Sequence, residues 1–254
     1  MTRSRFWRHN AAARTKARAG GFTLTELAIV VLIVGLLIGG LALTLTTQNE
    51  ARQFAETRSR LEVAQEALIG FAIRNGRLPC PATLGNGGIE APPGGGACTS
   101  ALNGVLPGAT LGLSGVTNGE LLDAWESPIR YAVTNWNANA FTTSNQIATL
   151  GVTALAPTLV VCNASLAGTP CSSAAPASQK LTADGTVVAV VYSLGKNWRA
   201  APGVDDEGEN QDNDANFVHH EPRPAGGTGG EFDDVMTWLS VNVLVNRMVA
   251  AGAL

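Results

Sequence analysis

One long uncharged segment near the N-terminus constrains this chain more than any other feature. Between Leu27 and Leu45 every residue is apolar, glycine or threonine. A helix of this length is about 28 Å long, close to the ~30 Å hydrocarbon thickness of a lipid bilayer. The segment therefore predicts a transmembrane helix.

The charge distribution predicts which side of a membrane each flank occupies. Residues 1–21 contain six of the 17 basic residues and no acidic residue, whereas the rest of the chain carries 11 Lys or Arg against 20 Asp or Glu. Basic flanks stay in the cytoplasm under the positive-inside rule, so everything after the helix is expected to be exported. The acidic balance of the exported part gives no reason to expect a nucleic-acid partner.

A secretory signal peptide would share the basic start and the apolar core. Two features favour a retained helix instead: the apolar run is longer than usual, and it lacks an A-x-A-like site at its end. Glu26 also lies at the start of this segment, where a carboxylate costs on the order of 2–3 kcal/mol. Unless its side chain reaches water at the membrane edge, this cost indicates a functional acid.

The residues around Glu26 resemble a known processing site. Residues 20–27 read GGFTLTEL after a short basic leader, which is similar to the N-terminus of type IV prepilins and type II secretion pseudopilins. In that family a prepilin peptidase cleaves after the glycine, and the new N-terminal residue is methylated. The resemblance implies cleavage after Gly21 and methylation of Phe22. Leu43 departs from the family, because many members carry a proline there.

The same resemblance implies a role for Glu26 in assembly. In an apolar filament core, its carboxylate and the Phe22 ammonium of a neighbouring subunit are each costly unless they pair, so the pair would fix the register. The implied partners are other pilin or pseudopilin subunits, the prepilin peptidase, an inner-membrane assembly platform and membrane lipid. The implied location is a single-pass inner-membrane protein with a cytoplasmic N-terminus and a periplasmic domain, which later reaches a pilus, a pseudopilus or the cell surface.

The helix is expected to continue beyond the apolar segment. Residues 47–76 carry apolar side chains at helical spacing, and Gly76, followed by two prolines, supplies a stop. Glu56 and Arg60 can pair one turn apart. Since no proline interrupts this part of the chain, we expect one continuous helix of about 50 residues.

The rest of the chain indicates a loop-rich β domain. Residues 79–115 are dense in glycine and proline, which excludes a long helix there. An apolar stripe after Ser240 predicts a short C-terminal helix that stops at Gly252. Runs rich in β-branched residues predict strands over 129–133, 158–162, 186–192 and 235–239.

The expected fold class is therefore α+β. With the resemblance, it becomes a pilin-like fold in which the long N-terminal helix, with a transmembrane half and an amphipathic half, packs on an antiparallel β-sheet, and a short helix ends the chain. The expected divisions are a basic leader over 1–21, a transmembrane or filament-core helix over 22–46, its amphipathic continuation over 47–76, and the exported domain over 77–254.

Two further motifs extend the resemblance into the exported domain. Residues 123–131 read DAWESPIRY and residues 191–195 read VYSLG. These are similar to the segment that opens the sheet, and to the next strand and turn, in major pseudopilins. The long loop-rich domain exceeds a typical major pseudopilin, which favours a minor subunit.

The cysteines predict disulfides. Neither local spacing contains a C-x₂-C pair that would suggest a metal, and the exported side is oxidising. We favour the two local pairings among the three that are possible, because each closes a loop rich in turn residues. These pairings are Cys80–Cys98 and Cys162–Cys171.

An acidic loop over residues 203–217 is the candidate metal site. Ca²⁺ takes about six to eight oxygen ligands, and the position of the loop after Tyr-Ser-Leu-Gly is similar to the calcium loop of major pseudopilins. A solvated acidic loop is the alternative. A zinc site at 219–221, which reads HHE, is disfavoured because the chain has too few histidines. The carboxylates are Asp205, Asp206, Glu207, Glu209, Asp212 and Asp214.

No nucleophile-elbow or nucleotide-binding motif is present in the sequence. We therefore expect a structural protein and not an enzyme: a pilin or pseudopilin subunit, of minor type, in a type IV pilus-like filament or a type II secretion pseudopilus. The alternative is a membrane-anchored exported binding protein or adhesin outside any filament. The sequence does not distinguish secretion, pilus and competence systems.

Overall fold

A single long helix begins the described part of the chain. The computed structural model describes residues 21–165, 170–200, 203, 205–227 and 229–254, and within the helix the side chains of residues 38–47 are not described. Helix α1 runs without interruption over Leu24–Asn75, 52 residues. It ends at Gly76, whose φ of +65° is the left-handed conformation typical of a residue that follows a helix. The predicted continuous helix and its stop are confirmed.

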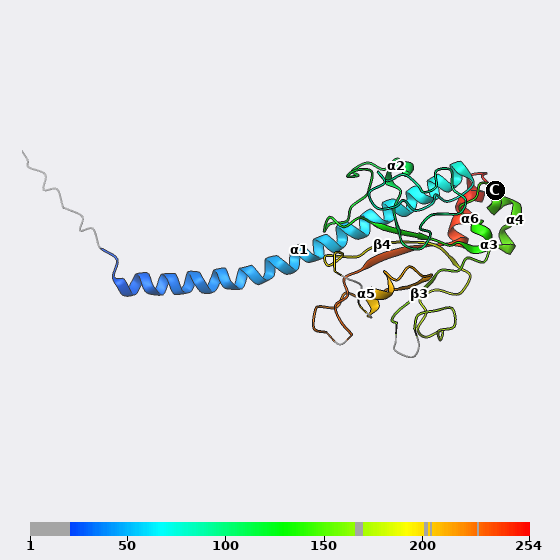
Figure 1. Cartoon of the computed structure of the whole chain (residues 1–254). Coiled ribbons are helices and arrows are strands. Elements are labelled where there is room, and N and C mark those ends of the chain that lie inside the picture. The colour runs from blue at the N-terminus through cyan, green and yellow to red at the C-terminus, as the bar shows by residue number, and fades with distance from the viewer. Residues whose placement is uncertain (1–20, 166–169, 201–202, 204, 228) are drawn as a thin grey trace, which may run out of the picture. The chain divides into compact units, whose positions relative to one another are not determined.

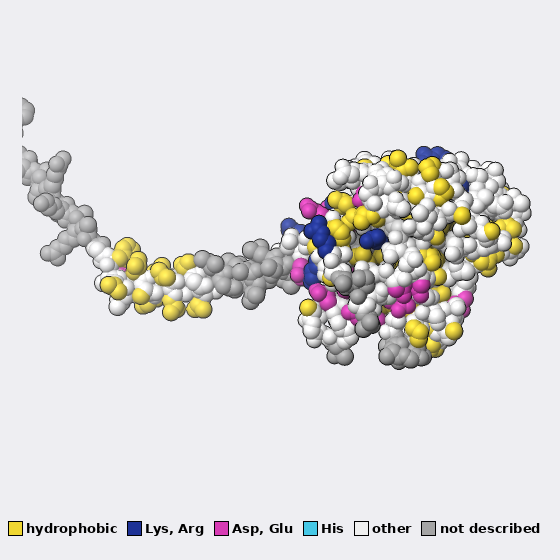
Figure 2. Space-filling view, viewed as in Figure 1, with side chains coloured by type: hydrophobic (Ala, Val, Ile, Leu, Met, Phe, Trp, Pro, Cys, Tyr) yellow, Lys and Arg dark blue, Asp and Glu magenta, His cyan; other side chains and the backbone are white. Residues whose placement is uncertain are grey.

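The chain divides into two compact units, residues 1–49 and residues 50–254. In the first unit, all large apolar side chains described on α1 and just before it are solvent-exposed, with exposed fractions from 45 to 87%. Figure 2 shows these side chains in yellow along the described part of the helix. They are Phe22, Leu24, Leu27, Ile29, Val30, Val31, Leu32, Ile33, Val34, Leu36 and Leu37.

The prediction that the first half of α1 spans a membrane is wrong. Within the described residues, no helix combines the length and the apolar character that a membrane crossing requires. The same finding contradicts the predicted location as a single-pass inner-membrane protein with a cytoplasmic N-terminus and a periplasmic domain. The leader residues 1–20 lie outside the described part.

The second unit is built on an antiparallel sheet of four strands in the order β1-β2-β4-β6. Strand β4 is central and fully buried, and it pairs with β2 and β6, with Tyr131 opposite Val191 and Val190 opposite Trp238. The α+β class and the antiparallel sheet are as expected. The strands are β1 (Gly104–Val105), β2 (Arg130–Val133), β4 (Val187–Ser193) and β6 (Val235–Ser240).

A second, two-stranded sheet was not expected. Strands β3 (Val160–Cys162) and β5 (Asn216–Val218) pair in parallel. Their apolar residues pack with Val190 and Tyr192 of β4 and with Ala132 of β2. Because both faces of β4 are covered, its sequence is a nearly continuous apolar run and not an alternating one.

The C-terminal part of α1 covers the other face of the main sheet (Figure 1). Its side chains Leu61, Leu68 and Phe71 share a core with Tyr131 and Val191. Helix α6 (Val241–Ala250) closes the same core, and its N-cap Ser240 accepts a hydrogen bond from the Val243 amide as the sequence predicts. Short helices complete the fold: α2 (Gly108–Leu111), α3 (Trp136–Asn139), α4 (Gln146–Leu150), the 3₁₀ turn Val152–Ala154, and α5 (Asp206–Glu209).

Both predicted disulfides are present. Cys80–Cys98 closes the glycine- and proline-rich loop, and Cys162–Cys171 closes the loop after β3. The first loop is also held by an ion pair between Arg77 and Glu90, whose side chains are buried and 2.7 Å apart.

Candidate functional site

The predicted processing residues Gly21 and Phe22 lie just before α1. Among the described residues, a side chain built on Gly21 would meet no atom within 4 Å, and the Phe22 side chain is 81% exposed. A peptidase could therefore reach the Gly21–Phe22 bond without local unfolding.

Glu26 also has a local structural role. The Glu26 amide donates to Thr23 Oγ1 at 3.2 Å, and the Thr23 amide donates to Glu26 Oε2 at 3.4 Å. This reciprocal arrangement is a capping box, which satisfies two backbone donors at the helix start. The spacing Thr-x-x-Glu is visible in the sequence, although our sequence reasoning assigned Glu26 to assembly alone. A substitution that tests assembly must therefore preserve the cap.

The six carboxylates of the predicted calcium loop do not converge on one point. Asp205 is the N-cap of α5, and its Oδ1 accepts from the Gly208 amide at 3.1 Å. The other five separate into an ion pair, a buried cluster and a surface cluster. The loop as predicted is therefore not a single site, and the three groups have different chemistry.

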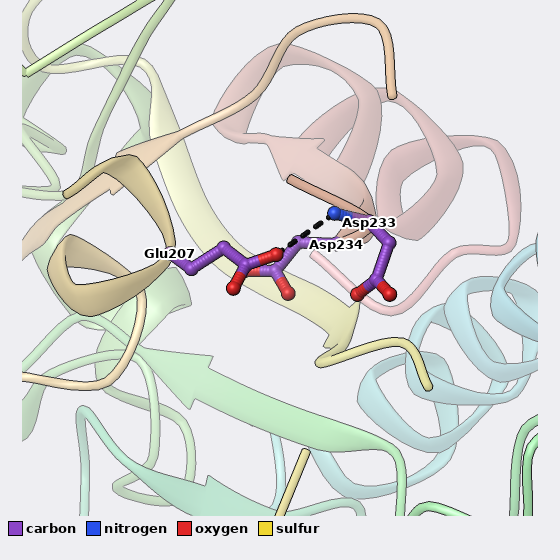
Figure 3. Close-up of side chains that lie close together, drawn as sticks. All are labelled: Glu207, Asp233 and Asp234. Atoms are coloured by element: carbon purple, nitrogen blue, oxygen red, sulfur yellow. Dashed lines mark hydrogen bonds between the residues drawn. The ribbon is translucent and has the colours of Figure 1, made fainter. Parts of the chain in front are cut away.

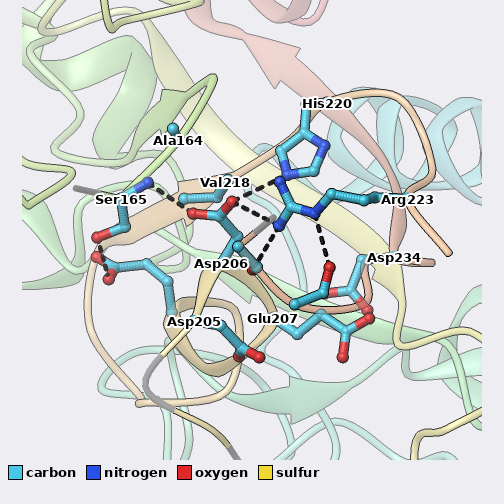
Figure 4. A network of polar contacts seen from close by, with 12 residues as sticks. Ala164, Ser165, Asp205, Asp206, Glu207, Val218, His220, Arg223 and Asp234 are labelled. Carbon is cyan, nitrogen blue, oxygen red and sulfur yellow. Dashed lines mark hydrogen bonds and ion pairs between the residues drawn. The ribbon is translucent and has the colours of Figure 1, made fainter. Parts of the chain in front are cut away.

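Asp206 is occupied by cationic and polar partners (Figure 4). Its Oδ2 lies 3.2 Å from Arg223 Nη2 and 3.0 Å from His220 Nε2, and its Oδ1 accepts from the Ser165 amide at 2.8 Å. A carboxylate satisfied in this way has little reason to bind a metal.

The adjacent histidines do not form a zinc site. His220 faces Asp206, with its ring centroid 3.8 Å from that of Phe232, whereas the His219 ring contacts Trp238. Burial lowers the pKa of His219. In the described ranges, no group of three metal-ligating side chains contains a histidine.

The second group is a buried carboxylate cluster formed by Glu207, Asp233 and Asp234 (Figure 3). These residues are 8, 3 and 2% exposed, and one oxygen from each lies within 4.8 Å of the others. Glu207 comes from α5, and the two aspartates come from the segment directly before β6. Our sequence reasoning included Glu207 but missed both aspartates. Consecutive acids next to a buried strand are the signal that could have found them.

The hydrogen bonds of the buried carboxylate cluster leave two oxygens without a partner. The Asp233 amide donates to Glu207 Oε1 at 2.9 Å, and the Asn210 side chain donates to Asp234 Oδ2 at 2.7 Å. Lys196 donates its amide to Asp233 Oδ2 at 3.3 Å. Among the described residues, Asp233 Oδ1 and Asp234 Oδ1 have no hydrogen-bond partner.

The electrostatics of this cluster are unfavourable without a cation. Burial raises the pKa of Asp233 to about 7 and that of Asp234 well above its usual range, and the neighbouring carboxylates add to both shifts. Burial likewise raises the pKa of Glu207. The nearest ammonium, on Lys196, lies 4.0 Å from Asp233 but 2.8 Å from Glu231. Unpaired buried oxygens of this kind fit a hard divalent cation.

The third group, Glu209, Asp212 and Asp214, lies nearer the surface. Asp212 accepts from the Asp214 amide at 3.1 Å, and Asp214 accepts from the Asn216 amide at 2.7 Å. Burial, and after it the Asp214 carboxylate, raises the pKa of Asp212 to about 6. Local turns explain these contacts, so the group matches the solvated acidic loop that was the alternative prediction.

Gly195, in the turn after β4, lies directly against the Asp233 carboxylate of the buried carboxylate cluster. Its φ is +60°, and a Cβ at this position would lie 1.8 Å from Asp233 Oδ1. Only glycine therefore fits between the turn after β4 and the Asp233 carboxylate.

Comparisons with protein-family models, curated proteins and solved structures each gave no match. The function is therefore inferred from the residues and geometry described above.

Proposed function

We propose that this chain is a structural subunit, of minor type, of a type IV pilus-like filament or a type II secretion pseudopilus. The observation that carries the proposal is the exposed apolar surface at the start of α1. Eleven large apolar side chains between Phe22 and Leu37 are at least 45% exposed. Full burial of each such side chain contributes about 1.5–3 kcal/mol, so association that covers them is strongly favoured.

The proposed occupant of this surface is the same segment of other subunits. The resemblance of residues 20–27 to prepilin processing sites supports this choice, because the leader in that family is removed before assembly. The space around Gly21 among the described residues and the exposed Phe22 side chain are compatible with such removal. After cleavage, the Phe22 ammonium of one subunit would pair with the Glu26 carboxylate of its neighbour, since both charges are costly in an apolar core.

The first experiment tests processing. Gly21→Leu, co-expressed with a prepilin peptidase, should migrate as the precursor, whereas the wild-type chain should be shortened. Gly35→Leu is the matched control, because this glycine also has open space around it but lies inside the apolar segment. Full-length precursor from both Gly21→Leu and Gly35→Leu, or a shortened chain from both, would contradict the assigned site.

The buried carboxylate cluster is proposed to bind Ca²⁺. Glu207, Asp233 and Asp234 would supply the carboxylate oxygens, including the two that have no partner. Calorimetric titration of the full chain with Ca²⁺ tests this. Asp234→Asn should abolish binding, and Asp184→Asn should not, because Asp184 is exposed and its ion pair among the described residues is with Lys180, away from the cluster's three carboxylates. No heat of binding in the wild-type chain would contradict the calcium assignment.

A further inference from the structure

Two buried acidic residues of the second unit contact the end of β4 and the turn after it. Asp123 contacts Ser193, the last residue of β4, and Asp233 contacts Gly195 and Lys196 in the turn. The turn follows β4 directly. It therefore lies between the buried carboxylate cluster and the segment that carries Asp123.

Asp123 organises that segment. Its Oδ1 accepts hydrogen bonds from the amides of Trp125 and Ser127, both at 2.8 Å, and its Oδ2 accepts from the Ser193 hydroxyl. The same Ser193 hydroxyl accepts from the Gly195 amide at 3.1 Å. Ser193 thus links Asp123 to the turn.

The segment around Asp123 is attached in turn to α1. Arg60 donates to the Leu122 carbonyl at 2.6 Å and to the Asp123 carbonyl at 2.9 Å, and the Ala124 amide donates to Thr57 Oγ1 at 3.2 Å. One ring contact adds to these bonds: Phe54 and Trp125 lie with centroids 5.0 Å apart.

On its other side, the turn is in contact with the cluster. A Cβ at Gly195 would lie 1.8 Å from Asp233 Oδ1, and the Lys196 amide donates to Asp233 Oδ2 at 3.3 Å, so the turn is in direct contact with that carboxylate. A cation drawn in by Glu207, Asp233 and Asp234 would pull these oxygens together. Without it, burial and mutual repulsion disfavour ionisation of the three groups, and Asp233 Oδ1 has no hydrogen-bond partner among the described residues.

We propose that a divalent cation in the buried carboxylate cluster fastens α1 to the sheet through Gly195, Ser193 and Asp123. The proposal rests on the cation site proposed above. The cation orders the turn, the turn positions the Ser193 hydroxyl on Asp123, and the ordered segment holds Thr57 and Arg60 of α1. Cation binding thereby controls how firmly the domain holds the helix that is proposed to build the filament.

Hydrogen exchange of the full chain, with Ca²⁺ or with chelator, tests this coupling. In the wild-type chain, Ca²⁺ should slow exchange by about fivefold or more in peptides covering residues 54–62 and 121–128. Ser193→Ala should keep the calorimetric Kd for Ca²⁺ within about threefold and lose that protection, while residues around Glu207 stay protected. Ser127→Ala is the matched control, because Ser127 is equally buried but its hydroxyl has no partner among the described residues.

A second variant tests the link from the helix side, in case Ser193→Ala does not fold. Arg60→Met removes the two bonds to the segment from a half-exposed position and leaves the Thr57 and Phe54 contacts, so Ca²⁺ should still protect residues 121–128 but protect residues 54–62 less than in the wild-type chain. Protection of residues 54–62 that survives Ser193→Ala and is undiminished in Arg60→Met would overturn the coupling. Loss of this protection in Ser127→Ala would also overturn the coupling. A wild-type chain that binds no Ca²⁺ in the titration would overturn the cation site and the coupling, but not the filament proposal, which is tested by processing.

Discussion

Replacing Asp233 by asparagine should stabilise the cation-free protein and remove its response to Ca²⁺. The reason is that Asp233 is 3% exposed, lies beside Glu207 and Asp234, and has one oxygen without a partner among the described residues. Asparagine has the same shape but no charge, so it relieves the repulsion and keeps an oxygen that can accept from the Lys196 amide.

The size of the effect follows from the pKa of Asp233, which is raised from 3.8 to about 7. A carboxyl whose pKa is higher in the folded state than in the unfolded state lowers stability as pH rises through this interval. At pH 8 the ionised form therefore costs on the order of 4 kcal/mol, from about three pKa steps of 1.36 kcal/mol each. After a discount for imperfect amide hydrogen bonding, Asp233→Asn should gain about 2–4 kcal/mol in chelator.

The assay is urea unfolding of the full chain at pH 8 and pH 5, with chelator or with Ca²⁺. At pH 5 the folded carboxyl is protonated while the unfolded one is mostly ionised, so the advantage of Asp233→Asn in chelator should shrink to roughly 1–2 kcal/mol. At pH 8, a hundredfold excess of Ca²⁺ over its Kd should stabilise the wild type alone by about 2.7 kcal/mol. A variant that is less stable than the wild type in chelator at pH 8 would refute the account of this cluster.

Three other predictions concern single positions. Gly195→Ala should destabilise the fold by about 2 kcal/mol or more and weaken Ca²⁺ binding in calorimetry, since its Cβ would clash with Asp233. Gly185→Ala controls for the positive φ alone, because its nearest neighbour is 4.0 Å away, and equal losses would contradict the clash. Glu90→Gln should cost about 3–5 kcal/mol in urea unfolding at pH 7, because it leaves the buried Arg77 guanidinium without a counter-charge. Burial opposes ionisation of Glu90, but the hydrogen bonds from Arg77, Cys80 and Gly94 and the Arg77 charge together outweigh it and lower the pKa, so this stability should disappear as pH falls below about 4; a pH-independent loss would argue against it. Glu26→Gln should keep the capping box and processing but reduce recovery in sheared filaments, and normal recovery would rule out the proposed charge pair.

Local sequence patterns predicted most of the secondary structure. The β-branched runs became β2, β3, β4 and β6, and Ser240 caps α6 as expected. These features depend on neighbouring residues, so a single sequence contains their signals. The parallel pairing of β3 with β5 joins segments far apart in the chain, and strand β5 is only Asn216–Val218, so no local pattern marks it.

The candidate metal site was predicted only in part, for the same reason. Carboxylate density marked residues 203–217, but density does not show which side chains turn inward. α5 directs Glu207 into the protein and Asp206 toward Arg223, and the fold adds Asp233 and Asp234 from beyond the loop. The transmembrane prediction rested on the hydropathy of the sequence alone, and no helix within the described residues is long and apolar enough to cross a membrane.

The central claim is that the chain is cleaved after Gly21 and assembles through the start of α1. Intact mass spectrometry of the protein recovered from sheared filaments, after co-expression with a prepilin peptidase, tests it most directly. The account predicts the mass of residues 22–254, with both disulfides formed and one methyl group on the Phe22 amine. A chain that retains residues 1–21, or one that begins beyond Leu45, would contradict it.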